Sequence, residues 1–150
     1  MRPYKGYIKD DKNFRPLSEN TIMLLGHVFE TAYIVNKITN EESPVFQFYG
    51  DPTCGLIGKY NDWCLVGGEI LILRTGVDNS VRSIGEFKNI HSLKAIDDYK
   101  AQILIDPWSE ESSIWQIEID LHKLTRPVNL YKLKDFKDYV DKPYTEEIFW

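Results

Sequence analysis

Cysteine is scarce in this chain of 150 residues, which contains only Cys54 and Cys64. Two thiols cannot form a structural zinc site, because such a site takes four ligands, and no histidine lies at ligand-like spacing from them. Without an export signal, two reduced side chains are expected, and a disulfide between them is the lesser alternative. The sequence predicts no metal site and no cofactor.

Long apolar runs are also missing. The longest, at 22–25 and 70–73, are far shorter than the roughly 20 residues of a membrane-spanning helix. The first 15 residues contain five basic groups and no apolar block, so they do not resemble a secretory signal. We therefore expect a cytoplasmic protein that does not bind a membrane.

The sequence contains no recognisable site for phosphate or nucleic acid. The glycines between 50 and 58 are not followed by the Lys-Ser/Thr pair that holds a nucleotide phosphate. The net charge is -5, and nucleic-acid binding requires clustered cations. The one basic cluster is at the N-terminus, where a solvated chain end is a sufficient explanation; it consists of Arg2, Lys5, Lys9, Lys12 and Arg15. No nucleic-acid partner is predicted.

Core-forming residues, by contrast, are abundant. The chain is 43% hydrophobic and 13% aromatic, which suits one folded domain spanning residues 1–150. Six of the nine glycines lie between Gly50 and Gly76, but no linker composition marks a boundary there. The aromatic content favours strands. We predict a mainly β domain, a sandwich or partly open barrel of antiparallel hairpins, with one or two short helices.

Three segments support this fold class. Apolar runs at 63–66 and 69–74 flank Gly67-Gly68, which predicts a hairpin whose glycines adopt the positive φ of a tight turn. Residues 21–38 fit a helical stripe or two strands, and their β-branched side chains favour strands; a helix there would make the fold α+β. Residues 133–140 have apolar side chains at helical spacing and predict a short helix.

The segment 101–122 is the most unusual part of the chain, because it holds five acidic residues and no Lys or Arg. Its second half alternates apolar and polar residues, which predicts a strand with one wet face, paired with 101–105. The polar tip, 106–113, carries a tryptophan among three carboxylates. The candidate binding residues are Asp106, Trp108, Glu110, Glu111, Glu118 and Asp120.

This acidic hairpin favours a binding protein over an enzyme, since the chain has no catalytic motif. Clustered carboxylates attract a basic protein, and an exposed tryptophan can anchor it. In size, charge and aromatic content the chain is similar to the small acidic immunity and antitoxin proteins that inhibit bacterial toxins. A protein of this kind would act by covering a cationic active site. The alternative is a solubilising turn with Trp108 folded back on the core.

Two other functions are open from the sequence. The first is a small hydrolase, with Cys54 as the nucleophile or with a carboxylate or metal site, such as Asp106 with Glu110 or Glu118. The second is a structural subunit of an assembly, because the chain ends on Ile-Phe-Trp. This apolar end either packs back on its own domain, which we favour, or docks on a neighbour.

Overall fold

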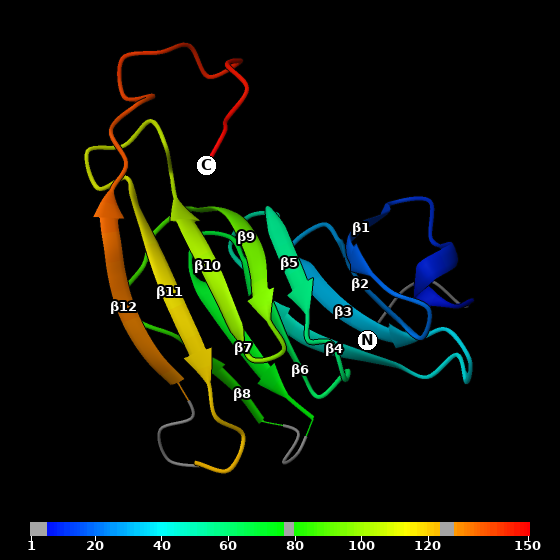
Figure 1. The fold of residues 1–150 in the computed structure, drawn as a ribbon. Coiled ribbons are helices and arrows are strands. Elements are labelled where there is room, and N and C mark those ends of the chain that lie inside the picture. Colours follow the sequence, from blue (N-terminus) through cyan, green and yellow to red (C-terminus); the bar gives the residue numbers. More distant parts are fainter. Residues whose placement is uncertain (1–5, 77–79, 124–127) are drawn as a thin grey trace.

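The computed structural model describes residues 6–76, 80–123 and 128–150, so Arg2 and Lys5 of the basic N-terminal cluster lie outside the described residues. The described residues form three antiparallel sheets of four strands each (Figure 1), which confirms a mainly β fold. The strands are β1 (Phe14–Glu19), β2 (Met23–Val28), β3 (Thr31–Asn36), β4 (Glu42–Gln47), β5 (Cys54–Ile57), β6 (Trp63–Gly67), β7 (Leu71–Thr75), β8 (Ser80–Ser83), β9 (Ile90–Asp97), β10 (Lys100–Ile105), β11 (Ser113–Ile119) and β12 (Val128–Asp135).

Each sheet is a simple meander, in which strands that are neighbours in the chain are neighbours in the sheet. The first sheet contains β1 to β4, the second β5 to β8 and the third β9 to β12. Strand β5, which opens the second sheet, packs beside β1 and β9, which open the other two (Figure 1). The described strands thus form three separately hydrogen-bonded sheets and not one closed barrel.

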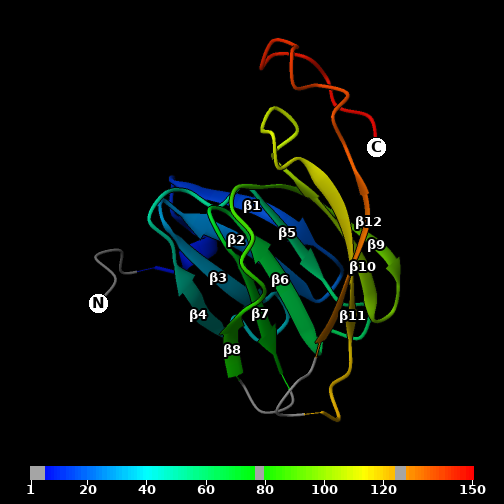
Figure 2. The ribbon, with the colours of Figure 1, turned by 90° about the vertical axis from the view of Figure 1, so that its left-hand side faces the viewer.

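The second sheet is the middle layer of the molecule (Figure 2). All five residues of β6 are buried, because alternate side chains of a strand point to opposite faces and both faces are covered here. Leu65 belongs to a cluster with Ile103 and Ile117 of the third sheet. Val66, on the other face, belongs to a cluster with Leu25 of the first sheet. The continuous apolar run at 63–66 is therefore explained by two-sided burial.

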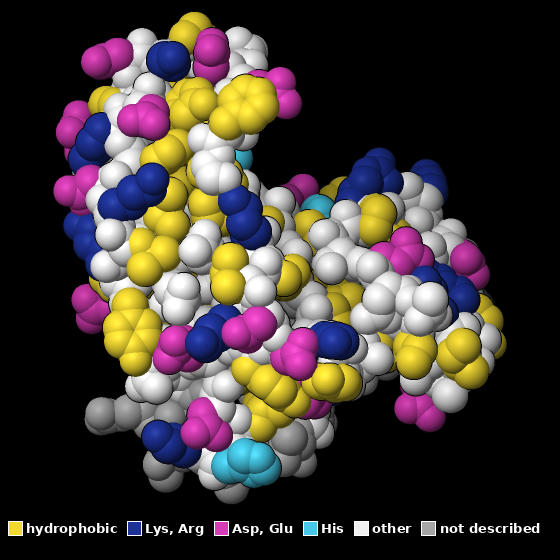
Figure 3. Space-filling view, in the orientation of Figure 1, with side chains coloured by type: hydrophobic (Ala, Val, Ile, Leu, Met, Phe, Trp, Pro, Cys, Tyr) yellow, Lys and Arg dark blue, Asp and Glu magenta, His cyan; other side chains and the backbone are white. Residues whose placement is uncertain are grey.

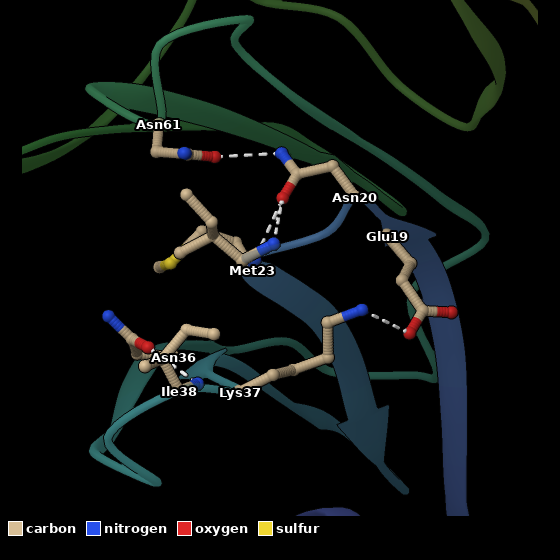
Figure 4. Close-up of polar contacts among 8 residues, drawn as sticks. Glu19, Asn20, Met23, Asn36, Lys37, Ile38 and Asn61 are labelled. Carbon is tan, nitrogen blue, oxygen red and sulfur yellow. Dashed lines mark hydrogen bonds and ion pairs between the residues drawn. The ribbon is translucent and has the colours of Figure 1, made fainter.

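Asparagine side chains fix the turns where the first two sheets meet (Figure 4). The Asn20 Oδ1 accepts hydrogen bonds from the backbone N–H groups of Ile22 (2.9 Å) and Met23 (2.8 Å). Its Nδ2 donates to Asn61 Oδ1 at 2.7 Å. Asn61 lies between β5 and β6 at a φ of 61°, a conformation that asparagine tolerates better than most residues. This pair of amides joins the β1–β2 turn to the second sheet.

The hairpin around Gly67 and Gly68 forms as predicted, but the reason given for its glycines is wrong. Strands β6 and β7 pair antiparallel, and neither glycine has a positive φ. Gly67 is the last residue of β6, and a Cβ placed on it would lie 2.7 Å from Ile90 Cγ2 and 2.8 Å from Cys54 Sγ. Glycine is required at this position by close packing and not by the turn.

Residues 21–38 contain β2 and β3, so the preference for strands is confirmed there. The short helix expected over 133–140 is absent, and that prediction is wrong. Strand β12 continues to Asp135 because it pairs with β11 from Ile119 back to Ser113. Cross-strand pairing here overrides the local helical spacing. Among the described residues, the helical content is one 3-10 turn, η1 (Ile8–Asp10).

Candidate functional site

The acidic hairpin is present as β10 and β11, but its six candidate residues do not share one surface. Lys100 pairs with Glu118 in the register, and Leu104 pairs with Ile114 next to the tip. The seven residues of β11 separate the tip from Glu118 and Asp120 by about 20 Å along the strand. The structure therefore divides the candidates into a tip group and a base group.

The base group faces lysines of the same chain. Lys100 Nζ lies 3.8 Å from Glu118 Oε2, and Lys123 Nζ lies 4.0 Å from Asp120 Oδ2. Exposed pairs of this kind stabilise a fold by about 1 kcal/mol at most, but they still offset the charge that a partner meets. The negative face expected along the whole strand is partly neutralised at this end.

Trp108 in the tip is half-buried and contacts the C-terminal segment, residues 136–150. Its Nε1 donates a hydrogen bond to the carbonyl oxygen of Pro143 at 3.1 Å. Its ring centroid lies 5.3 Å from that of Tyr144 and 5.7 Å from that of His91. Trp108 therefore packs against its own domain, as in the alternative in which it folds back on the core. Its ring also contacts the rings of His91 and Tyr144.

The C-terminal segment packs on the third sheet, and in Figure 1 it projects beyond the end where β10 stops. Ile148 and Trp150 contact a cluster that contains Leu104 and Ile114. Lys94 holds the last residue, with its Nζ 4.2 Å from the centre of the Trp150 ring. Two of the three apolar end residues, Ile148 and Trp150, thus pack on their own domain, the arrangement we favoured over docking on a neighbour, whereas Phe149 is 70% exposed.

A hollow of about 740 Å³ opens beside the tip group. It lies among the connections that join β4 to β5, β6 to β7, β8 to β9 and β10 to β11. Figure 3 shows that the surface is indented between the projecting C-terminal segment and the body of the molecule. The hollow is lined by Tyr49, Gly50, Asp51, Thr53, Gly68, Glu69, Asn89, Ile90, His91 and Asp106.

Three of these lining residues are acids and none is Lys or Arg. Asp51 is exposed, and no described Lys or Arg lies within 4.0 Å of the carboxylates of Asp51, Glu69 or Asp106. Glu69 Oε1 accepts a hydrogen bond from the N–H of Tyr49 at 2.9 Å, and Asp106 Oδ1 accepts one from the N–H of Trp108 at 3.1 Å. The hollow is therefore suited to a cation.

Asp106 alone of these three acids was identified from the sequence. Asp51 and Glu69 were missed because they lie in other connections, 55 and 37 residues before Asp106 (106 − 51 and 106 − 69). Glu110 and Glu111 are exposed at the tip and form no ion pair with another described residue. The sequence Gly-Asp-Pro indicates that Asp51 lies in a turn, but no pattern in the sequence indicates that it lies near Glu69.

The surroundings of His91, in the wall of the hollow, change the pKa of its side chain. Burial lowers the pKa of its imidazole, and the nearby negative charge of Asp106 offsets part of that effect by raising the pKa. The Nδ1 lies 2.6 Å from Ser92 Oγ, which fixes the ring orientation. Near neutral pH the ring is uncharged and adds no positive charge to the hollow.

We expect the free energy of unfolding to fall as the pH drops below 6.5, the ordinary pKa of histidine. The folded pKa of His91 is lowered, so between that value and 6.5 the unfolded chain binds more protons than the folded chain. Stability therefore rises with pH across this window. Urea unfolding at a series of pH values measures it. His91→Gln should flatten this part of the curve, and an unchanged slope would assign it to other groups.

Cys54 does not have the surroundings of a nucleophile. Burial raises the pKa of its thiol to about 11, and its sulfur receives a hydrogen bond from Thr53 Oγ at 3.7 Å, not from a histidine. Cys64 is buried in a different cluster, and burial raises its pKa to about 12. Both cysteines are free thiols. The proposed carboxylate pair Asp106 and Glu118 lies at opposite ends of the hairpin, so it has no geometry for acid–base catalysis.

Alkylation tests this conclusion about Cys54. With its pKa raised from 9.0 to about 11, the thiolate fraction at pH 8 falls about a hundredfold. We expect iodoacetamide to modify the native protein at least that much more slowly than it modifies a cysteine peptide. In urea the rate should return to the peptide value. Modification of native Cys54 at the peptide rate would support the hydrolase alternative.

Comparison with known proteins gives no relative from which a function can be inferred. No protein-family model matches the chain, and no curated protein matches it. Within 6–76, 80–123 and 128–150, no three or more His, Cys, Asp and Glu side chains gather as they would around a metal ion. In the same ranges no helix has the length and apolar character needed to cross a bilayer. The chemistry of the hollow is therefore the basis for a functional proposal.

Proposed function

We propose that this protein is a non-enzymatic binding protein for a basic protein partner, which it contacts through the acidic hollow and the adjoining tip. One observation supports this most directly: three carboxylates from three separate connections line a cavity that contains no Lys or Arg. The tip adds Glu110 and Glu111 at its edge, both exposed. A concave surface of one sign attracts a partner of the opposite sign.

Charge explains how the partner is attracted, and aromatic side chains explain how it is held. Carboxylates in a concave site focus the electric field and raise the rate of association. Tyr49 is 91% exposed at the hollow, and tyrosine is among the residues that most often carry the binding energy of an interface. A bacterial toxin with a cationic active site has the required chemistry, and covering that site would inhibit it. In its specific form, the proposal is an immunity-type or antitoxin-type inhibitor.

A charge-matched pair of variants tests this proposal. Asp51→Lys with Asp106→Asn changes the net charge by +3 in the hollow, and Asp120→Lys with Glu118→Gln makes the same change at the base of the hairpin. Each variant and the native chain are used to capture proteins from the native host at low salt. Circular dichroism checks that all three are folded.

The proposal predicts that a basic protein captured by the native chain is retained by the base variant and lost by the hollow variant. We expect a loss of about a hundredfold in affinity, since charges inside an interface contribute about 2 to 5 kcal/mol on truncation. Equal capture by the two variants would overturn the proposal. A further variant, Glu110→Lys with Glu111→Lys, tests the tip. If this variant loses the partner and the hollow variant keeps it, the interface lies at the tip and not in the hollow.

A further inference from the structure

We propose that the C-terminal segment is a latch, which opens while the three sheets stay folded and which changes the wall of the hollow when it opens. In the closed state it covers Leu104 and Ile114 and fixes Trp108, whose ring contacts His91. The opening is independent of the proposed function, because it follows from the way the segment is attached to the sheets.

The backbone of the segment takes no part in this attachment beyond Phe136. The N–H of Phe136 donates to the carbonyl oxygen of Ser112 at 3.0 Å, which continues the pairing of β12 with β11. Within the part of the chain that the structure describes, every backbone–backbone hydrogen bond of residues 137–150 stays inside that stretch. No strand or helix forms there, and Figures 1 and 2 show an irregular chain projecting from the end of β12. The segment can therefore leave without breaking a strand ladder.

Side chains of the sheets and the tip supply the hydrogen bonds that reach the segment. Trp108 Nε1 donates to the carbonyl oxygen of Pro143 at 3.1 Å, and Lys94 Nζ donates to the carbonyl oxygen of Trp150. The Lys94 Nζ also lies 4.2 Å from the centre of the Trp150 ring, as a cation–π contact. The rest of the attachment is apolar packing, including that of Ile148. Contacts between side chains separate without displacing a neighbouring strand.

Internal hydrogen bonds make the segment one unit. The N–H of Phe149 donates to the hydroxyl oxygen of Tyr139 at 3.1 Å, which joins the two ends of the segment. The N–H of Lys142 donates to the carbonyl oxygen of Tyr139 at 3.0 Å, and that of Glu146 to Pro143 at 2.9 Å. Local units with few contacts to the remaining structure open at a lower free energy than the whole protein unfolds. We therefore expect one opening event and not gradual fraying.

Opening uncovers an apolar site on the outer face of the third sheet. Leu104 and Ile114 are partners across β10 and β11, and they are 0% and 4% exposed. The neighbours of Leu104 in β10, Ile103 and Ile105, point to the opposite face and belong to the core shared with the second sheet. The other members of the outer cluster lie in the tip or in the C-terminal segment itself. The segment is therefore what shields this pair from water.

Trp108 connects the latch to the hollow. Its ring centroid lies 5.3 Å from that of Tyr144 in the segment and 5.7 Å from that of His91, which lines the hollow. Opening removes Tyr144 and the hydrogen bond to Pro143, so the ring is no longer fixed against His91. A ligand that binds one of the two states better shifts the segment toward that state.

Hydrogen exchange of the full native chain tests the opening. It is measured by NMR at several low urea concentrations, with the Trp108 indole N–H as the reporter of the latch and the amides of β6 as reporters of global unfolding. The indole proton should exchange about a hundredfold faster than the β6 amides, at a rate nearly independent of urea, because a local opening exposes little surface. Equal rates with equal urea dependence would overturn the proposal.

Trp150→Ala and Phe149→Ala form a matched pair of variants. Both remove an aromatic ring from the chain end, but Trp150 packs on the outer cluster and Phe149 is 70% exposed. Trp150→Ala should speed exchange of the Trp108 indole by about tenfold, increase the fluorescence of the dye ANS and shift the ring-proton NMR signals of His91. Phe149→Ala should change none of these, and both variants should keep the native far-UV circular dichroism. Identical behaviour of the two variants, or unchanged His91 signals when the indole exchanges faster, would contradict the proposal.

Discussion

Replacing Trp108 with alanine should lower the free energy of unfolding by about 3 kcal/mol, the lower end of the range for removing a packed tryptophan, since this one is half-buried. The change removes the hydrogen bond to Pro143 and the ring contacts with His91 and Tyr144. It should also loosen the C-terminal segment, because Trp108 packs against the cluster that holds Ile148. Urea unfolding and amide hydrogen exchange over residues 136–150 measure the two effects.

Trp108→Phe separates the ring contacts from the hydrogen bond. Phenylalanine keeps an aromatic ring between the neighbouring side chains but cannot donate to Pro143, so we expect a loss of about 1 kcal/mol. Exchange in the C-terminal segment should stay close to that of the native protein. If Trp108→Ala leaves exchange there unchanged, Phe136 and Tyr139 hold the segment without it, and its packing on the tip is incidental.

The second large effect is expected for Gly67→Ala, which should destabilise the fold by about 2 to 3 kcal/mol. The added methyl would lie 2.7 Å from Ile90 Cγ2, inside the main core cluster, and 2.8 Å from Cys54 Sγ, which packs against that cluster. Both are short, packed side chains, so β6 would have to move away from β5 and β9. Thermal unfolding and urea unfolding measure the loss.

Gly50→Ala is the matched control, because a Cβ there has nothing within 4 Å. Its stability should stay within about 0.5 kcal/mol of the native value, as for most surface changes. Gly67 also accepts a hydrogen bond through its carbonyl from Thr53 Oγ at 3.2 Å, and Thr53 lines the hollow. Gly67→Ala should therefore weaken binding as well as stability. Equal stability of the two variants would show that the core yields around Gly67.

Local patterns were sufficient to predict the hairpin of β6 with β7 and the hairpin of β10 with β11. Alternating residues after Ser113 identified the strand that pairs with 101–105, and the apolar runs on either side of Gly67 identified another hairpin. In both, the partner strand is next in the chain, so a short window of sequence contains the whole interaction. The preference for strands over residues 21–38 succeeded for the same reason.

Contacts between distant segments could not be predicted in this way. The packing of Gly67 against Ile90 joins two sheets, and nothing near Gly67 in the sequence signals it. The hollow depends on Asp51, Glu69 and Asp106 lying at one place, although they come from three connections that are far apart in the chain. The helix expected over 133–140 failed because the pairing of β12 with β11 determines that backbone, and spacing within the segment cannot reveal a partner.

The division into three meanders has a consequence for how the chain acquires its structure. Each sheet is complete within one continuous stretch, 14–47, 54–83 or 90–135, although the second and third stretches include residues that the structure does not describe. The strand pairs within each sheet are close in the sequence. Proteins dominated by such local contacts fold faster than proteins whose paired strands are far apart in the sequence. During synthesis, the ribosome would release each stretch in turn, and the sheets would stack on one another as they emerge.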